Sequence, residues 1–390
     1  MKILAALAVA FFAAAAFGQD VPCEKYTLGN GMTVILHEDH SLPVATVNIW
    51  YHVGAKDEPA HRSGFAHLFE HLMFMGTKRV PKGGFDNIME AGGGDNNAST
   101  TQDRTNFYDY GPSSLLPTLL WLEADRLEDL GKSMDQKKLD LQREVVKNER
   151  RENVENAPYG RVSLDVDAAM YPESHPYHID TIGLPADIDA ATVKDVQAFF
   201  ATYYVPNNAT LVVAGDFDAK TIKPLIEKLF GTLPRADDPI RKVAPDAALH
   251  GVKRLTVVDA VAQSRVYMVW HSPAIYKPGD AEMDLLAGIL ADGFASRLYQ
   301  RLVVKDKLAS DVSADQDPQM LDSLFTISAT ARDGVSLDKI ESEIDEEVSG
   351  LLATGPTPDE LNRIKEKYEF GAFSSLQDLS DVADRLNQYD

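Results

Sequence analysis

One short segment of this chain, SGFAHLFEHLMFMG, combines a buried helix with charged chemistry. It begins at Ser63, a residue type that caps helices, and ends at Gly76, which favours a helix stop. The residues between are apolar on nearly every side, which is typical of a helix buried in a core. The only ionisable residues there are His67, Glu70 and His71, and at about 3.6 residues per turn they share one face. The chain is therefore expected to bury two imidazoles and a carboxylate side by side.

The spacing of these three residues predicts a zinc site. Neutral imidazole is a common zinc ligand, and His67 and His71 are one helical turn apart, so both can reach one ion. Glu70 shares their face and could take a proton from a water molecule that the metal activates. His-x-x-Glu-His is the reverse of the zincin motif and is the inverzincin signature. The alternative is a buried polar triad in which hydrogen bonds satisfy all three groups.

Catalytic zinc needs a third protein ligand, and the predicted helix LDLQREVVKNERRENVEN offers several acids. Helical phase ranks them. Glu149 lies within about 60° of Val146 and so on the apolar stripe, whereas Glu144 and Glu155 point more than about 120° away. We therefore expect Glu149 to face inward and Glu144 and Glu155 to lie on a solvated face. Glu152 remains the nearest competitor for the third ligand position.

Overall composition excludes some classes of protein. With 390 residues, of which 44% are hydrophobic and 25% charged, the chain is long enough for two globular domains. Sixty Asp and Glu against 38 Lys and Arg give a formal net charge of -22. Phosphate backbones and anionic lipid surfaces would be repelled on average. We therefore expect no nucleic-acid partner.

The first residues, MKILAALAVAFFAAAAFGQD, predict a cleaved signal peptide over residues 1–18 and a mature chain beginning near Gln19. A secreted or periplasmic location follows from this prediction. The alternative is an uncleaved anchor. No other stretch approaches the length of a membrane span, so none is expected after signal cleavage. Cys23 is the single cysteine and cannot form an internal disulfide.

The pattern of elements along the chain indicates an α+β fold. Two predicted strands, in LGNGMTVILHED and VATVNIWYHVG, precede the buried helix, and NATLVVAGDF predicts a central strand after several further helices. We expect a mixed or antiparallel sheet with helices packed on one side. A proline- and charge-rich linker at 236–251 would separate an N-terminal domain, 24–235, from a second domain, 252–390.

The second domain partly repeats the first. RLTVVDAVAQSRVYMVW echoes the strand pair MTVILHEDHSLPVATVNIW, and a predicted helix, DAEMDLLAGILADG, again follows. The echo suggests two similar domains, the second without a counterpart of the histidine-bearing helix. Because the second domain is shorter and ends in an unfinished helical segment, we expect it to be incomplete.

Four ordered motifs together resemble the pitrilysin/insulinase family of zinc metallopeptidases, the inverzincins. The motifs are GFAHLFEHLMFMGT, NNASTTQDRTNFY, LQREVVKNERRENVENAPYG and HPYHIDTIG, and the resemblance extends from about Tyr26 to the end of the chain. Relatives include mitochondrial processing peptidase beta-type subunits and bacterial periplasmic homologues. The resemblance implies a two-domain α+β unit that pairs with a second unit as a clamshell. It also implies Zn²⁺ as cofactor, His67, His71 and Glu149 as metal ligands, and Glu70 as general base.

The resemblance further implies a place for the peptide substrate. Asn97, Ala98 and Ser99 match the family's edge strand, whose backbone pairs with an extended peptide, and such strand addition binds through main-chain hydrogen bonds. The alternative is a plain polar loop before a strand. One position departs from the family pattern: Gln142 stands where relatives often carry a second acid, seven residues before Glu149.

A second departure lies in FASRLYQRLVVKDKLAS, which resembles a family segment that presents an arginine and a tyrosine to the partner's active site. The matching positions here are Val303 and Ser310, and neither is a strong hydrogen-bond donor for a tetrahedral oxyanion. Arg301 or Arg297 could substitute if the alignment is shifted. We therefore expect a heterodimer in which a homologous partner subunit supplies the Arg/Tyr pair.

The leading hypothesis is a zinc-dependent endopeptidase or oligopeptidase that hydrolyses extended or unfolded peptides. A rival is a peptide-binding scaffold without turnover. The ionisable cluster of His67, Glu70, His71 and Glu149 argues against this rival, because a scaffold does not need such a cluster. A second rival is a structural metal site. Such a site would normally be closed by a fourth protein ligand, and no cysteine is nearby to supply one.

Overall fold

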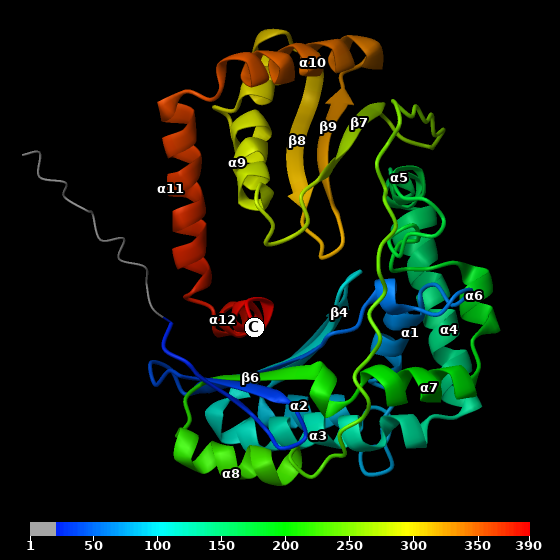
Figure 1. The fold of residues 1–390 in the computed structure, drawn as a ribbon, viewed down its shortest axis with the longest axis vertical. Coiled ribbons are helices and arrows are strands. Elements are labelled where there is room, and N and C mark those ends of the chain that lie inside the picture. The colour runs from blue at the N-terminus through cyan, green and yellow to red at the C-terminus, as the bar shows by residue number, and fades with distance from the viewer. Residues whose placement is uncertain (1–20) are drawn as a thin grey trace, which may run out of the picture.

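The computed structural model describes residues 21–390, so the predicted signal peptide, 1–18, lies outside the described residues. Two separate β-sheets, each flanked by helices, stand one above the other in Figure 1. One is mixed and the other antiparallel, so the predicted α+β class with two similar domains is confirmed. Within the described part of the chain, every helix is too short or too polar to span a bilayer.

The first sheet has six strands in the order β1-β2-β6-β3-β5-β4. Their bounds are β1 (Glu24–Thr27), β2 (Thr33–Glu38), β3 (Val44–Tyr51), β4 (Asp95–Thr100), β5 (Thr105–Pro112) and β6 (Ala209–Gly215). Only β2 and β6 run parallel; the other neighbours are antiparallel. The strand NATLVVAGDF indeed forms the centre, because every residue of β6 is buried. β4 forms one edge of this sheet.

Most helices of the first domain cover one face of this sheet (Figure 1). They are α1 (Phe65–Leu72), α2 (Gly84–Gly92), α3 (Leu116–Ser133), α4 (Gln136–Arg150), α7 (Val193–Tyr203) and α8 (Ala219–Leu229), with α5 (Val162–Met170) and α6 (Pro185–Ala190) nearer the second sheet or the rim. Successive strand residues point to opposite faces. Accordingly Val34 and Leu36 of β2 lie in the main core, while Ile35 between them faces away from it.

The opposite face of the first sheet is covered by the last helix of the chain, α12 (Leu379–Gln388). Ala383 of α12 packs on Ile35, Val212 and Ala214, which form a small core cluster of their own. Figure 1 shows α12 lying between the two sheets. The expectation of helices on one side therefore describes the first domain's own helices, and the second domain adds a helix on the other side.

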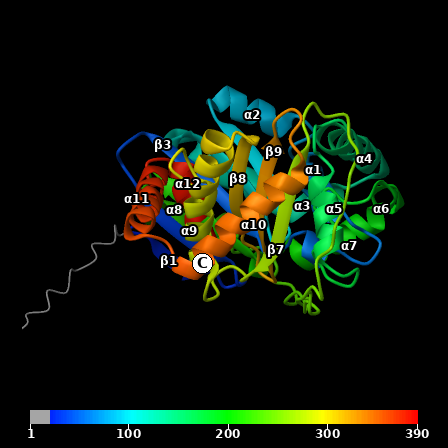
Figure 2. The same cartoon turned by 90° about the horizontal axis from the view of Figure 1, so that it is seen from above.

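The second sheet repeats part of the first. Its strands β7 (Arg265–Ser272), β8 (Ala309–Asp317) and β9 (Ser323–Ala331) lie in the order β7-β9-β8, which is the order β3-β5-β4 of the first sheet. Helix α9 (Asp280–Ala291) follows β7 as α1 follows β3. Helices α10 (Leu337–Thr354) and α11 (Pro358–Ser375) complete this domain. Seen from above, α11 and α12 lie on the opposite side of the molecule from α4 and α6 (Figure 2).

One part of the predicted repeat is wrong. The segment RLTVV was expected to be the counterpart of β2, but residues 234–264 contain no helix or strand. In the first sheet β2 is held by β6, which lies between β2 and β3. Among the described strands, none occupies that place beside β7, so RLTVV lacks a backbone partner. The domain limits 24–235, 236–251 and 252–390 stay a prediction.

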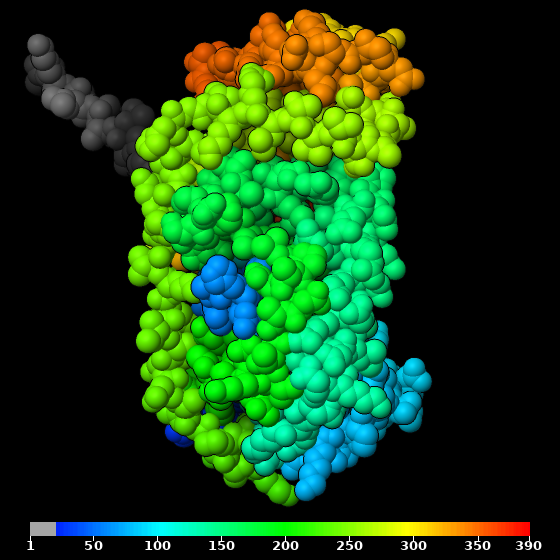
Figure 3. All heavy atoms as spheres, turned by 90° about the vertical axis from the view of Figure 1, so that its right-hand side faces the viewer, coloured from blue at the N-terminus to red at the C-terminus, as the bar shows by residue number. Residues whose placement is uncertain are grey.

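The segment that connects the two sheets runs along the molecular surface (Figure 3, yellow-green). Side chains of Arg241 and Lys242 donate to the backbone carbonyls of His52 and Glu58 in the first domain. These contacts fasten the connection to the loop just before α1. The segment is therefore anchored although it has no regular structure.

Candidate metal centre

Helix α1 does not begin with the predicted cap. Its N-cap is Gly64, in the left-handed region with φ 76°, and the Ser63 side chain makes no cap. Instead Ser63 Oγ donates to Asp187 Oδ2 at 2.6 Å. The N–H groups at the start of the helix, which have no carbonyl partner within it, are satisfied by Glu58. Its carboxylate accepts from Gly64 N–H at 3.0 Å and from Ala66 N–H at 2.8 Å. A carboxylate from outside the helix thus replaces the predicted serine cap.

The end of α1 also differs from the prediction. The helix ends at Leu72, four positions before Gly76, which adopts φ 79° and begins a separate turn. Burial raises the pKa of Glu58 at the other end to about 8, against the opposing effect of its backbone N–H donors. The N-terminal end of α1 is therefore set by Glu58, outside the 14-residue motif, and its C-terminal end falls short of the predicted glycine stop.

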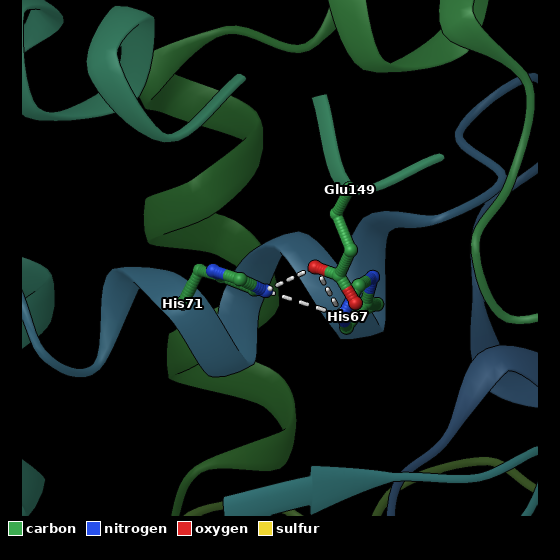
Figure 4. A group of neighbouring side chains, drawn as sticks. All are labelled: His67, His71 and Glu149. Carbon is green, nitrogen blue, oxygen red and sulfur yellow. Dashed lines mark hydrogen bonds and ion pairs between the residues drawn. The ribbon is translucent and has the colours of Figure 1, made fainter. Parts of the chain in front are cut away.

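The apolar part of α1 is sealed in the core, as the sequence predicts. Five of its eight residues are buried: Phe65, Ala66, Leu68, Phe69 and Leu72. The side chains of His67 and His71 remain 13% and 23% exposed. The polar face is thus the one accessible side of this helix, and its histidines face Glu149 of the neighbouring helix α4 (Figure 4).

Three side chains converge at this face (Figure 4). His67 Nε2 and His71 Nε2 are 3.2 Å apart, and Glu149 Oε2 lies 3.6 Å from the first and 3.2 Å from the second. Within the described residues this is the one group of His, Cys, Asp or Glu side chains with the spacing of a metal site. Ligands about 2.0–2.1 Å from a tetrahedral zinc lie about 3.3–3.4 Å apart, so the triangle has the size of a zinc site.

Glu149 reaches the histidines because of its phase on α4. Val146, one turn earlier, is 1% exposed and fixes the inward side of the helix. Glu144 is 63% exposed and pairs with Lys147 at 2.7 Å. Glu152 is exposed, in a π-helical turn (Arg151–Glu155) that continues α4, and lies outside the triangle. Of the candidate acids, the structure brings Glu149 alone to the two imidazoles.

The protonation states at rest suit a cation. Burial, followed by repulsion from His71, lowers the pKa of His67 to about 4, so its ring is neutral near pH 7. A hydrogen bond from His71 lowers the pKa of Glu149 below its ordinary value. A neutral imidazole and an ionised carboxylate are the forms that bind metal.

Glu70 lies beside the triangle but is not one of its corners. Burial raises the pKa of Glu70, and a hydrogen bond from Thr100 Oγ1 at 2.5 Å partly offsets this effect. Thr100 is the last residue of β4, so the carboxylate is tied to the edge of the sheet. Sequence reasoning missed Thr100. Its position directly after Asn97, Ala98 and Ser99 was the only signal for it.

Those three residues lie in β4, not in a loop. β4 pairs with β5 on one side and with no other described strand, so its second edge is open. Asn97 is exposed, and its Oδ1 accepts from the Ala98 N–H at 2.8 Å. α1 packs beside this strand. An open strand edge therefore runs next to Glu70.

The departures from the family pattern have ordinary structural surroundings. Gln142 is buried and its amide contacts Met75 Sδ at 2.8 Å. Val303 packs against the second domain's core, and Ser310 Oγ donates to Gln263 Oε1 at 3.1 Å. Among the described residues, neither Gln142 nor Ser310 hydrogen-bonds to His67, His71 or Glu149.

Both arginines that the sequence analysis offered as substitute donors, Arg297 and Arg301, are engaged in ion pairs. Arg297 Nε and Nη2 donate to the two carboxylate oxygens of Glu360 at 2.7 and 2.8 Å. Arg301 is paired with Asp306 and Glu343. Both guanidinium groups serve the packing of the second domain.

Comparison with known proteins decides the family. Residues 33–178 match the family model described as "Insulinase (Peptidase family M16)", and residues 190–368 match "Peptidase M16 inactive domain". The zinc protease PqqE of Helicobacter pylori is 31% identical over 94% of this chain and 83% of its own. The chain belongs to the M16 peptidase family. The family predicted from the four motifs is thereby confirmed, and the triangle lies wholly within the region matched by the insulinase model, 33–178.

Other M16 proteins extend the comparison. The beta subunit of the mitochondrial-processing peptidase of Blastocladiella emersonii is 25% identical over 95% of this chain and 80% of its own. The crystal structure of a protease from Helicobacter pylori superposes with a TM-score of 0.85 at 30% identity, covering 95% of this chain and 90% of that one. The periplasmic protease PqqL of Escherichia coli, at 21% identity and a TM-score of 0.77, shares the fold over 96% of this chain and 43% of its own.

Proposed function

We propose that this M16 chain is the catalytic subunit of a zinc-dependent peptidase that cleaves extended or unfolded peptides. The observation that carries the proposal is the triangle of His67, His71 and Glu149 (Figure 4). The separate carboxylate of Glu70 is close enough to interact with the charges of His71 and Glu149. The names of the relatives, which include several zinc proteases, support the same metal. A structural metal site would normally need a fourth protein ligand, and the described residues bring none to this group.

The two imidazoles and Glu149 would hold the zinc ion. Zinc in such a three-ligand site supplies Lewis acidity, which activates water and polarises a peptide carbonyl. The chain's own part is to present two neutral nitrogens and one carboxylate oxygen at separations of 3.2–3.6 Å. Because all three side chains come from packed helices, the site needs little reorganisation to bind.

Glu70 would act as the general base. Its carboxylate accepts a proton from the attacking water and later passes it to the leaving amine. Burial raises the pKa of Glu70, which makes it a better proton acceptor, while Thr100 holds one of its oxygens. A base of this kind must be oriented, and the Thr100 hydrogen bond supplies the orientation.

The open edge of β4 would bind the substrate. A peptide that adds to this edge as a strand pairs with the backbone at Asn97, Ala98 and Ser99. Its main chain would then pass beside Glu70, to which β4 is tied through Thr100. Recognition through main-chain hydrogen bonds favours extended peptides over folded proteins.

The proposal includes a partner and a location. The resemblance places Val303 and Ser310 where relatives carry an arginine and a tyrosine, and Arg297 and Arg301 are committed to ion pairs. A homologous subunit would therefore supply the transition-state donors. The signal peptide predicted for residues 1–18 would place the complex outside the cytoplasm, in the periplasm or beyond.

Replacing Glu70 with Gln tests the proposal. The variant should keep its zinc, because Glu70 is not a corner of the triangle, and should lose peptide hydrolysis by about a hundredfold or more, because the base is gone. Zinc is measured by metal analysis and hydrolysis with a fluorogenic peptide, in the presence of the partner subunit.

The matched control is Thr100→Ser, which keeps the hydroxyl that orients Glu70. It should retain most of the activity. Loss of zinc from Glu70→Gln, or turnover close to that of the parent, would show that Glu70 has another role. A scaffold without catalysis would leave the parent itself inactive with every peptide and partner.

A further inference from the structure

One guanidinium lies on the face of the first sheet that α12 covers, close to the open edge of β4. Arg104, in the turn between β4 and β5, donates through Nη1 to the Ser99 carbonyl at 2.9 Å, to Ser99 Oγ at 2.5 Å and to Asn106 Oδ1 at 3.1 Å. Its guanidinium carbon is 5.1 Å from the ring centroid of Trp50. The group is thus held in place by neutral partners.

The charge of Arg104 has no close counter-ion. Among the described residues, no carboxylate oxygen lies within 4.0 Å of its guanidinium nitrogens. Two carboxylates, those of Asp384 in α12 and Glu70 in α1, act on its charge from farther away. Asp384 Oδ1 accepts from Asn48, Trp50 and Asn106 at 3.1, 3.0 and 3.0 Å, and Glu70 Oε2 accepts from Thr100 Oγ1 at 2.5 Å. Arg104 is partly buried, and burial lowers its pKa below the ordinary value. A partly desolvated cation without an ion pair is costly unless a ligand completes it.

We propose that Arg104 is a specificity determinant that binds a carboxylate of the peptide substrate. This inference rests on the proposed function, because it assumes that the peptide adds to the open edge of β4. The carboxylate could belong to an Asp or Glu side chain or to the peptide's C-terminus.

Strand geometry brings such a carboxylate within reach. Ser99 and Asn106 share one face of the sheet, where their side chains are hydrogen-bonded at 2.7 Å, whereas Ala98 packs toward the core on the other face. A peptide residue directly opposite Ser99 would place its Cβ about 4.5–5.5 Å from the Ser99 Cβ on the same face. The guanidinium lies over β5 and β3 and reaches Ser99 Oγ from that inner side, so an acidic side chain at that peptide position would extend across Ser99 to pair with it.

The same position lies close to the bond to be cleaved. Thr100 follows Ser99 in the chain, and its Oγ1 donates a hydrogen bond to Glu70 Oε2 at 2.5 Å. The peptide residue that faces Ser99 is therefore near the proposed base along the strand. Arg104 would select which peptide bond is presented, although the overall charge of the chain is -22.

A purely structural role makes a different prediction. Through the Ser99 carbonyl, Arg104 also braces β4, so its removal could weaken the binding of every peptide equally. Charge selection, by contrast, changes the ratio between acidic and neutral peptides. Arg104→Gln keeps an N–H donor for the brace and removes the charge, and Arg104→Glu reverses the charge.

The test is peptide binding to the full chain in a Glu70→Gln background, measured by fluorescence anisotropy. The probes are fluorescein-labelled peptides with a single Asp, Asn or Lys at successive positions, each as a free acid and as a C-terminal amide. We expect Asp at one position to bind about tenfold more tightly than Asn, an advantage that Arg104→Gln abolishes and Arg104→Glu transfers to Lys. If only the free acids show the advantage, the C-terminus is the ligand.

Three results would overturn the inference: equal weakening of all peptides in Arg104→Gln, an Asp advantage that persists in that variant, or no binding of any probe. Thermal melting of each variant shows whether the chain still folds. Because binding needs no turnover, the two proposals can fail separately. If the Asp advantage depends on Arg104 but the parent chain cleaves no peptide even with the partner subunit present, this inference stands and the peptidase proposal fails. Cleavage by the parent with its partner, without charge selection, gives the reverse result.

Discussion

Helices α1 and α9 occupy the same place in two sheets of the same strand order, yet only α1 carries a candidate metal site among the described residues. Each follows the first strand of a β3-β5-β4 or β7-β9-β8 arrangement. In α1 the polar residues share a face that opens toward α4, whereas in α9 the acids Asp280, Glu282 and Asp284 lie in the first half and the last five residues are buried. The apolar pattern therefore sets the topology, and a few polar positions on one helix face set the chemistry.

The triangle on α1 also differs from the arginines of the second domain in how its charges are balanced. In the triangle on α1, the Glu149 carboxylate contacts two imidazoles and no Lys or Arg side chain. Its negative charge therefore favours the binding of a cation. In the second domain, Arg297 and Arg301 are each bound by acids of neighbouring helices or turns. The first domain also has buried ion pairs, such as Arg126 with Glu123, so the contrast concerns the triangle and not the whole domain.

The largest effect that this contrast predicts is the response to a partner. Because the second domain offers Val303 and Ser310 where donors are expected, the lone chain should be a weak peptidase, and a homologous subunit with the arginine and tyrosine should raise turnover by about a hundredfold or more. The measurement is a peptide-cleavage assay with the full mature chain alone and after mixing with that subunit.

A variant of the partner provides the control for that experiment. A partner whose arginine and tyrosine are replaced by Val and Ser should give no increase. Full activity of the lone chain, unchanged on mixing, would mean that the donors lie elsewhere in this sequence, and the contrast between the two domains would lose its functional meaning.

A smaller effect concerns the ion pairs of the second domain. The hydrogen bonds from Arg297 lower the pKa of Glu360 to about 2 from an ordinary 4.5. A lowered pKa in the folded state stabilises the fold above about pH 4.5, and this contribution is lost as the pH falls toward about 2. Glu360→Gln should therefore cost about 0.2–1 kcal/mol of unfolding free energy near pH 7, and the difference from the parent should shrink in acid.

Urea unfolding between pH 7 and pH 3 checks this prediction. Gln at position 360 can keep the capping interaction with Thr357 through its one amide oxygen, so the variant removes the charge and one of the two acceptors for Arg297. Glu366→Gln, exposed on the same helix, is the matched control and should change stability little. A deficit in Glu360→Gln that stays constant over the whole pH range would show that the ion pair is not its cause.

The motif and the helix phase made the candidate site predictable. His67, Glu70 and His71 are adjacent on one helix, and Val146 marks the inward side of α4, so local periodicity was enough to select Glu149. The α+β class followed from the order of strands and helices. These features depend on residues that are close in sequence.

Features set by distant residues could not be predicted in this way. The cap of α1 comes from Glu58, and the orientation of Glu70 depends on Thr100, which reaches it only when β4 packs beside α1. The cover of the first sheet's second face comes from α12, at the far end of the chain. RLTVV has the composition of a strand but no neighbour to pair with. In each case, contacts with segments distant in the sequence, or their absence, decided the structure, and local propensity did not.

The most direct test of the account is a zinc titration of the full chain and of two variants of α4. The parent should bind one zinc per chain. Glu149→Gln removes a corner of the triangle and should weaken zinc binding by at least about a hundredfold, because even the loss of an outer hydrogen-bond partner of a zinc ligand costs about tenfold to a hundredfold. Glu144→Gln, an equally conservative change at a position that is 63% exposed, should leave zinc affinity unchanged. Unchanged zinc affinity in Glu149→Gln, or a loss in Glu144→Gln instead, would contradict the assignment of the metal centre.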